Sequence, residues 1–324
     1  MISVIIPTHN RQDVLIRTLT SLEEQDFSKT DFEVLVVDDG SQDRTRAAVE
    51  DFRSRTDIRL RYFRQKKAGP AQARNLGVDE ACGDLLLFCG DDVLFAKDNL
   101  SRHAQMHQKM PGHAVLGAVL WDPSIPLNDF MRFLAPAGPQ FRFHTIRDVR
   151  QAGFHHFYTA NISLDKKWFR EARFDTRFRS AAFEDIDLGL VLEKKGLKVF
   201  YCAEARVYHA HYYRPWMFYR RMYRVGKNMT VFWDKHKTSM RDLMKIGFHY
   251  GPFMVCPYGL NLFHAVSTVA GKSRLVKHLS LRLHWNANIS RFYSKGIIEA
   301  FKHQESENDP GPFASSPNSG RPSE

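Results

Sequence analysis

Three acidic pairs recur along the 324-residue chain, and they are Asp38-Asp39, Asp91-Asp92 and Glu184-Asp185. The first two pairs follow apolar runs of strand length, VLVV and LLLFC, and the third opens a helical pattern. Carboxylates clustered at strand ends suit a divalent metal and a nucleotide, because hard cations prefer oxygen ligands on rigid supports. The alternative is that these acidic residues only begin solvated loops. This explanation would suit any one pair, but it accounts less readily for all three pairs in this order.

Strand-like and helix-like segments alternate over the first hundred residues. The expected strands are 2–7, 32–37, 59–65 and 85–89, and the expected helices run from about 13, 42 and 70. Asp13 is a candidate cap for the first helix. The alternation predicts an α/β fold whose parallel sheet is covered by helices on both faces. Ligands of such sheets bind beyond the carboxyl ends of the strands, where the first two acidic pairs fall.

Later segments are less regular. Strands are expected at 114–121 and 198–202, a helix at 183–195, another helix from Pro215, and a long loop at 122–157. Residues 246–270 are apolar but interrupted by polar residues and prolines, so they suit a helical hairpin or an interfacial segment rather than a membrane span. We therefore divide the chain into a domain at 1–213, a basic, aromatic-rich helical extension at 214–303, and a disordered tail at 304–324.

The net charge of +11 is concentrated in one segment. Residues 1–100 carry 14 Lys or Arg against 18 Asp or Glu, a net of −4, whereas residues 205–300 carry 16 against 3, a net of +13. Such a block can face nucleic acid, acidic lipid or a phosphorylated substrate. The four cysteines are scattered and the N-terminus begins at once with a strand-like run, so we expect a reducing, cytoplasmic setting without a signal peptide.

Five segments in a fixed order resemble a known family, and they are SVIIPTHNR (3–11), VVDDGSQD (36–43), KAGPAQARNLG (67–77), FCGDD (88–92) and FEDIDLGLVLEKKG (183–196). Together they resemble the family 2 glycosyltransferases with the GT-A fold, over roughly residues 1–215. The resemblance implies a Rossmann-like mixed, mostly parallel sheet with helices on both faces. It also implies a nucleotide-sugar half at about 1–121, an acceptor half at about 122–213, and inverting transfer of a sugar to a hydroxyl acceptor.

The resemblance assigns the donor site. Asp92 is expected to coordinate Mg²⁺ or Mn²⁺ on the diphosphate, and Asp91 to lie near the ribose or a metal-bound water. The family often has a third carboxylate or Asp-x-Asp here, whereas this chain has Gly90 in the first position, so we expect weak metal binding without nucleotide. A histidine after a later strand often completes the metal site; His209 matches better than His211, although the spacing alone does not choose between them.

Further residues are expected to hold the nucleotide. Asp39 resembles the residue that accepts a hydrogen bond from the imide of a uracil-type base, which UDP-sugars and dTDP-sugars present equally. Pro7, Thr8 and Arg11 resemble the loop that contacts base and ribose. Arg74 matches a residue that packs on the base, and a surface arginine on a helix is its alternative reading.

Glu184-Asp185 resembles the pair that supplies the catalytic base. A hydroxyl group is a poor nucleophile at neutral pH, so a carboxylate within hydrogen-bond reach must take its proton. We assign Asp185 as the base and Glu184 as a neighbour that orients it; a pair that only caps the helix is the alternative. Arg220, Arg221 and Arg224 would contact the diphosphate or an acidic acceptor, or form a solvated helix face.

The expected partners are a nucleotide-sugar donor and a saccharide or lipid-linked saccharide acceptor, in surface polysaccharide or glycolipid assembly. Segment 205–300 is expected to make peripheral contact with the anionic inner face of the plasma membrane. Nucleic acid is not expected, because the N-terminal third is acidic and no nucleic-acid motif is present. A nucleotide-sugar-binding protein without catalysis remains an alternative, as does a nucleotidyltransferase, although PTHNRQD (7–13) lacks the glycine-rich, lysine-bearing loop of that class.

Overall fold

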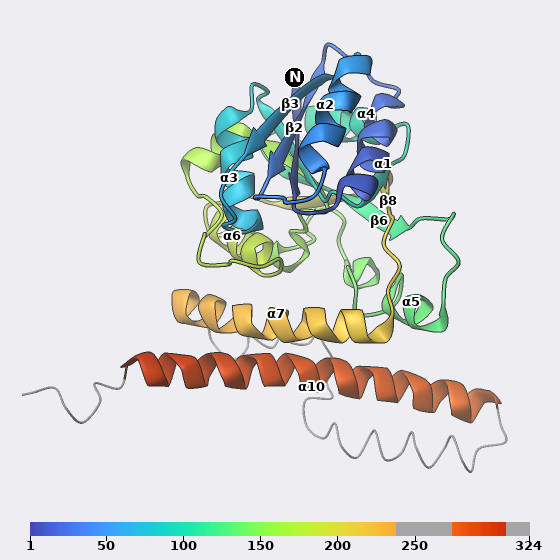
Figure 1. Cartoon of the computed structure of the whole chain (residues 1–324), viewed down its shortest axis with the longest axis vertical. Helices are drawn as coiled ribbons and strands as arrows, with labels where there is room; N and C mark the ends of the chain where they lie inside the picture. Colours follow the sequence, from blue (N-terminus) through green and yellow to red (C-terminus); the bar gives the residue numbers. More distant parts are fainter. Residues whose placement is uncertain (238–273, 309–324) are drawn as a thin grey trace, which may run out of the picture.

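The computed structural model describes residues 1–237 and 274–308, and its centre is one eight-stranded sheet (Figure 1). The strands are β1 Ile2–Thr8, β2 Phe32–Asp38, β3 Arg59–Arg64, β4 Leu85–Cys89, β5 Val93–Phe95, β6 Ala114–Trp121, β7 Asn161–Asp165 and β8 Val199–His209. Their order across the sheet is β3-β2-β1-β4-β7-β6-β8-β5. Strands from both predicted halves of the domain therefore belong to one continuous sheet.

The pairing is parallel at β3-β2-β1-β4 and at β6-β8, and antiparallel where β7 meets β4 and β6 and where β5 meets β8. The predicted α/β fold with a mixed, mostly parallel sheet is confirmed. The sequence analysis did not predict β5 or β7, which are only three and five residues long. Strand β8 also extends beyond the predicted 198–202 and ends at His209.

The helices are α1 Gln12–Glu23, α2 Thr45–Arg55, α3 Pro70–Glu80, α4 Asn99–Lys109, α5 Asp129–Leu134, α6 Glu184–Glu193, α7 Pro215–His236 and α10 Arg274–Asn308, with short 3-10 turns η1 Phe143–Thr145, η2 Phe154–His156 and η3 Lys166–Arg170. The prediction that Asp13 caps the first helix is wrong. Arg11 occupies the cap position without a side-chain bond, and Asp13 lies in the first turn. A carboxylate there still interacts favourably with the helix dipole.

Both faces of the sheet are covered, as the apolar strands require. All seven residues of β2 are buried, a pattern typical of parallel strands with helices on both sides. On one face, Val4 packs in a cluster with Leu15 and Leu19 of α1. On the other face, Ile5 packs in a cluster with Val78 of α3.

Helices α7 and α10 lie side by side beneath the sheet domain (Figure 1). Two glycines permit this close contact. A Cβ atom on Gly226 would lie 2.1 Å from the carbonyl oxygen of Tyr293, and one on Gly296 would lie 2.0 Å from that of Tyr223. In the described part of the chain, no helix is both long enough and apolar enough to cross a membrane.

Two sequence predictions concern regions that are only partly described. The apolar segment 246–270 lies outside the described residues. Helix α10 runs to Asn308, whereas the sequence analysis placed the start of a disordered tail at residue 304. Residues 304–308 are thus helical, and the rest of the predicted tail lies outside the described residues.

Candidate active site

A cavity of about 810 Å³ opens at the carboxyl ends of β1, β2 and β4 and is closed by α6, the end of β8 and the first half of α7. All ten residues that the sequence analysis proposed for the site line this cavity, and they are Pro7, Thr8, Arg11, Asp39, Arg74, Asp91, Asp92, Glu184, Asp185 and His209. Parallel strands that end at one edge bring the N-terminal acidic pairs together, as expected. The third pair joins them from the N-terminus of α6.

Asp91 and Asp92 share one cation, the guanidinium of Arg11. Arg11 lies 3.2 Å from an Asp91 oxygen and 2.8 Å from Asp92 Oδ2, and the Thr8 hydroxyl donates to Asp91 at 2.8 Å. Burial raises the pKa of Asp91, and Arg11 opposes that rise. Burial also acts on Asp92, but His209 and Arg11 outweigh it and hold the pKa of that carboxyl below its ordinary value. The pKa of Asp92 is therefore lower than that of Asp91, so Asp92 loses its proton first as the pH rises.

Two histidines approach Asp92 from the end of β8. The Nε2 atom of His209 lies 3.5 Å from Asp92 Oδ2, and Nδ1 of His211 lies 3.9 Å from the same oxygen. Burial lowers the pKa of both imidazoles, and the Asp92 carboxylate opposes that shift. An imidazole binds a metal in its neutral form. His209 is buried, whereas His211 is partly exposed.

The donor set fits a divalent metal that also takes oxygens from its substrate. In the described residues, no three Asp, Glu, His or Cys side chains form a metal site by themselves. The carboxylate oxygen Oδ2 of Asp92 and the imidazole nitrogen Nε2 of His209 nevertheless face each other at 3.5 Å, and both are atoms that bind divalent metals. Mg²⁺ commonly binds through one or two carboxylates plus substrate phosphates. The residues thus fit a metal that binds together with a diphosphate.

Asp39 is held by the loop that leads into α3. Its carboxylate accepts hydrogen bonds from the backbone N–H groups of Ala68 at 2.7 Å and Gly69 at 2.9 Å, and from the Gln65 side chain at 2.7 Å. Its neighbour Asp38 instead accepts from the backbone N–H of Ser41 at 2.7 Å. The carboxylate of Asp39 therefore has a fixed position in the wall of the cavity.

The third acidic pair has one internally paired member and one partly exposed member. Glu184 is 2% exposed, lies 2.8 Å from Arg74 and accepts the backbone N–H of Ala182 at 2.6 Å. Asp185 is partly exposed to the cavity and accepts weakly from the backbone N–H of Thr159 at 3.4 Å. Burial and the adjacent Glu184 together raise the pKa of Asp185 to about 7, while Arg74 opposes both. A carboxyl group in this state can exchange a proton near neutral pH.

Several residues of the cavity were not found from the sequence. Phe141 and Tyr158 line the cavity from the irregular segment before β7, and their rings contact each other at 5.5 Å between centroids. The Phe141 ring also contacts that of His209 at 6.2 Å. Trp216 lines the cavity from α7 and is 57% exposed; the sequence analysis placed this residue only in the aromatic-rich extension at 214–303. The irregular segment offered no periodic pattern from which to place its side chains.

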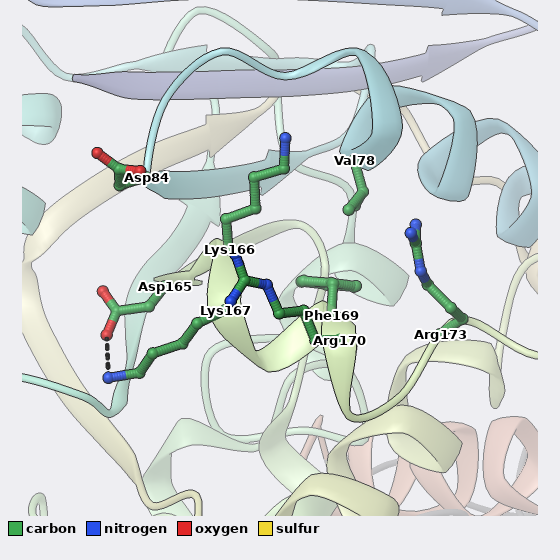
Figure 2. Close-up of a pocket in the computed structure, with 8 residues that line it drawn as sticks. All are labelled: Val78, Asp84, Asp165, Lys166, Lys167, Phe169, Arg170 and Arg173. Atoms are coloured by element: carbon green, nitrogen blue, oxygen red, sulfur yellow. Dashed lines mark ion pairs between the residues drawn. The ribbon is translucent and has the colours of Figure 1, made fainter.

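A second cavity, of about 340 Å³, lies at the amino end of β4 and contains none of the proposed site residues (Figure 2). It is lined by basic side chains, including Lys167, which pairs with Asp165 at 3.3 Å. Another basic side chain, Arg173, pairs with Asp79 at 2.6 Å. Basic side chains of this second cavity are therefore already engaged in surface ion pairs. We take the larger cavity as the candidate active site.

Solved structures share this fold over nearly the whole chain. A mannosyltransferase from Pyrobaculum calidifontis, in complex with GDP-Man and Mn²⁺, aligns with a TM-score of 0.65 and 17% identity, covering 94% of this chain and 87% of that one. Staphylococcus aureus TarS in complex with UDP-GlcNAc aligns with a TM-score of 0.54 and 19% identity, covering 94% and 92%. The fold is therefore of the GT-A type.

Sequence comparison identifies the family. The family model described as Glycosyl transferase family 2 matches residues 3–173, which is more than half of the 324 residues. The chain belongs to glycosyltransferase family 2. Among curated relatives, validoxylamine A glucosyltransferase of Streptomyces hygroscopicus subsp. limoneus is 32% identical in an alignment of 225 residues that covers 61% of this chain and 49% of that protein. The poly(ribitol-phosphate) beta-N-acetylglucosaminyltransferase TarS of Staphylococcus aureus is 39% identical over 98 residues, 30% and 17% of the two chains. The chain thus spans about half the length, or less, of these relatives.

Proposed function

We propose that this chain is an inverting glycosyltransferase that moves a sugar from a nucleotide-diphosphate sugar to a hydroxyl acceptor. The observation that carries the proposal is the gathering of Asp39, Asp92 and Asp185 around one cavity. Each has a different environment, as base reading, diphosphate binding and proton transfer require. UDP- and dTDP-sugars are the favoured donors, because the carboxylate of Asp39 suits the imide that uracil and thymine share.

The donor binds across the carboxyl ends of β1, β2 and β4. We expect Pro7, Thr8 and Arg11 to contact the base and the ribose, and Arg74 to lie against the base; all four residues line the cavity. Asp92 and His209 would hold Mg²⁺ or Mn²⁺, with Asp91 beside them. The metal, when bound, supplies positive charge to the diphosphate as the leaving group becomes more negative. A solved relative of the same fold was obtained with Mn²⁺ and a nucleotide-sugar.

Asp185 acts as the general base. Its carboxylate takes the proton of the acceptor hydroxyl as that oxygen attacks the anomeric carbon, and the nucleotide diphosphate leaves from the opposite face, which inverts the configuration. A positioned base of this kind contributes roughly 10²- to 10⁴-fold to the rate. Glu184, which is paired with Arg74, orients the neighbouring Asp185 beside the sugar.

The acceptor enters along α7, where Trp216 and the arginines 220, 221 and 224 line the cavity. A saccharide suits this wall because the exposed Trp216 ring can stack on a sugar face, while the arginines can meet a phosphate of the donor or of a lipid-linked acceptor. TarS, which the chain resembles in part, is named for transfer to poly(ribitol-phosphate). We assign the chain to surface polysaccharide or glycolipid assembly, at the cytoplasmic face of the membrane and in peripheral contact through 205–300.

A thermal-shift screen tests the donor assignment, because a ligand that binds the native state raises the melting temperature. UDP, dTDP, GDP and their sugars are each compared with and without Mn²⁺. We expect the uracil and thymine nucleotides to stabilise the protein, and to do so more strongly with Mn²⁺. Stabilisation by GDP alone would contradict the role given to Asp39. Release of nucleotide diphosphate is then assayed with the stabilising nucleotide-sugar and an acceptor. Stabilisation without any release would favour the alternative of a binding protein without catalysis.

A further inference from the structure

The turn before the third acidic pair adopts a strained backbone. Ala182 has φ of 106° and Phe183 has φ of 73°, and neither is glycine. Such conformations are costly for residues with a side chain and persist only where the surroundings hold them. Residues 179–183 also line the cavity next to Glu184 and Asp185. Whatever holds this turn therefore fixes the direction in which α6 presents its first residues.

Asn228 of α7 makes the contacts that hold the turn. Its side-chain Nδ2 donates to the carbonyl oxygens of Ser180 at 2.9 Å and Ala182 at 2.8 Å. Its Oδ1 accepts from the Ser180 hydroxyl at 3.4 Å. Asn228 is 7% exposed, so these bonds face little competition from water. One buried amide thus fixes two carbonyls of the same turn, at a sequence distance of almost fifty residues.

The other side of the turn rests on the donor loop. A Cβ atom on Gly69 would lie 2.7 Å from the carbonyl oxygen of Arg179, so only glycine permits this approach. The N–H group of Gly69 donates to Asp39 at 2.9 Å. The turn is therefore confined between the loop that holds Asp39 and the helix that carries Asn228.

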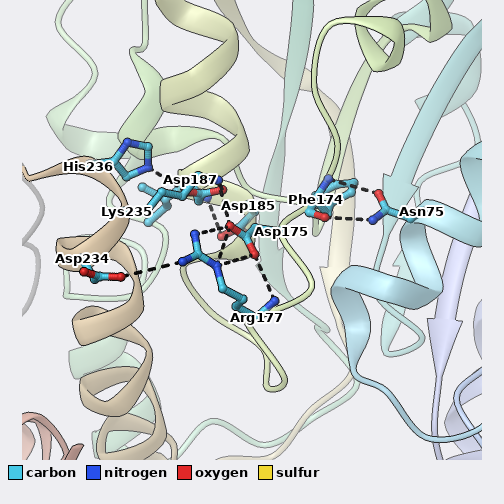
Figure 3. A network of polar contacts seen from close by, with 10 residues as sticks. Asn75, Phe174, Asp175, Arg177, Asp185, Asp187, Asp234, Lys235 and His236 are labelled. Carbon is cyan, nitrogen blue, oxygen red and sulfur yellow. Dashed lines mark hydrogen bonds and ion pairs between the residues drawn. The ribbon is translucent and has the colours of Figure 1, made fainter. Parts of the chain in front are cut away.

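Helix α7 is itself fixed against α6 by a buried ion-pair network (Figure 3). The carboxylate of Asp187 is fully buried and lies 2.7 Å from Lys235 Nζ and 2.7 Å from His236 Nε2. Lys235 also lies 3.1 Å from Asp175, which pairs with Arg177 at 2.8 Å. Figure 3 shows the side chains of Lys235 and His236 directed at Asp187 from the end of α7. This anchor prevents α7 from sliding relative to the turn that Asn228 holds.

We propose that Asn228 is a positioning residue for glycosyl transfer, which holds the 180–183 turn so that Asp185 points into the cavity. In this arrangement the helix that lines the acceptor end of the cavity also fixes the proposed base. The inference rests on the proposed function, and its consequence is that losing the Asn228 amide slows the chemical step more than it weakens donor binding.

Three full-length variants test the proposal. Asn228→Ala removes the amide, and Asn228→Asp keeps its shape while replacing the donor with an acceptor. Thr230→Val is the matched control, because its buried hydroxyl donates only within α7, to the carbonyl of Lys227 at 2.8 Å. We expect kcat of both Asn228 variants to fall by about 10- to 100-fold with KM for the donor changed less than about twofold, because small misplacements of a catalytic group cost about this much. The control should retain the wild-type kcat.

Hydrogen exchange of residues 180–185 provides a readout that does not depend on turnover. Both Asn228 variants should exchange faster there than wild type, and Thr230→Val should not. A kcat per folded molecule equal to that of the control, or unchanged exchange in the turn, would overturn the positioning role. If the wild-type protein transfers no sugar, the proposed function fails, and the exchange data still decide whether Asn228 holds the turn.

Discussion

The guanidinium of Arg74 lies 2.8 Å from the carboxylate of Glu184, and both side chains are almost fully buried at 8% and 2% exposure. This ion pair joins α3, which follows the donor loop, to the first turn of α6, which carries the proposed base. Arg74 also lies over the Phe174 ring, 5.6 Å from its centroid. The nucleotide side and the acceptor side of the cavity are thus linked by one buried charge pair.

Breaking that pair should destabilise the fold. Arg74→Met leaves the buried carboxylate of Glu184 without its cation, and we expect the free energy of unfolding to fall by about 3 kcal/mol. Urea denaturation measures the change. Combining Arg74→Met with Glu184→Leu removes both charges and should recover part of the loss. Additive losses in the double variant would show that the two side chains do not stabilise each other.

The rate of transfer should depend on the ionisation of Asp185. The pKa of this carboxyl is raised to about 7 by burial and by Glu184, and a general base works only when deprotonated. We therefore expect kcat to fall as the pH is lowered through about 7. Glu184→Gln removes the neighbouring negative charge, so the acid limb of the pH–rate profile should move to lower pH. A limb that stays at the wild-type position would contradict this origin of the pKa shift.

The same carboxyl should make the fold less stable at high pH. Its pKa is higher in the folded protein than the ordinary value near 4 of an unfolded chain, so its contribution to stability is present at low pH and is lost as the pH rises through about 7. Asp185→Asn removes this dependence. The variant should therefore melt at a higher temperature than wild type at pH 8, with a smaller difference at pH 5. An equal difference at both pH values would show that ionisation of Asp185 has no effect on folding.

Metal-dependent nucleotide binding should show which of the two histidines beside Asp92 is the metal ligand. Asp92→Ala and His209→Ala should both weaken binding of UDP in the presence of Mn²⁺, while binding without metal changes little. His211→Ala should have the smaller effect, because its ring lies farther from Asp92, at 3.9 Å against 3.5 Å. Calorimetric titration of UDP with and without Mn²⁺ measures this. A larger loss from His211→Ala would transfer the ligand role to that residue.

The sequence predicted those parts of the site whose position follows from neighbouring residues in the chain. Asp39 and Asp92 follow apolar strands directly, and parallel strands end at a common edge, so their convergence did not require a structure. The antiparallel strand β7 was not predicted, although its sequence NISLD alternates polar and apolar residues. Alternation over five residues indicates a strand but not its neighbours, so the position of β7 between β4 and β6 required the structure.

Contacts between distant segments were also beyond the sequence analysis. Arg74 was expected to pack on the nucleotide base, and its ion pair with Glu184 joins residues 110 positions apart. Asn228 was one polar residue among many on a basic helix. The positioning role that we propose for it depends on the placement of α7 beside the 180–183 turn. Every residue type has a backbone carbonyl, so the sequence of the turn does not reveal that Asn228 binds there.

The assignment of Asp185 as the base is tested most directly by Asp185→Asn, which keeps the size of the side chain and removes its ability to accept a proton. Release of nucleotide diphosphate from UDP-sugars and dTDP-sugars is measured with Mn²⁺ and a panel of saccharide and lipid-linked acceptors, alongside UDP binding to the same variant. We predict a loss of transfer of about 10³-fold or more with UDP affinity nearly unchanged. Turnover close to that of wild type would contradict the account.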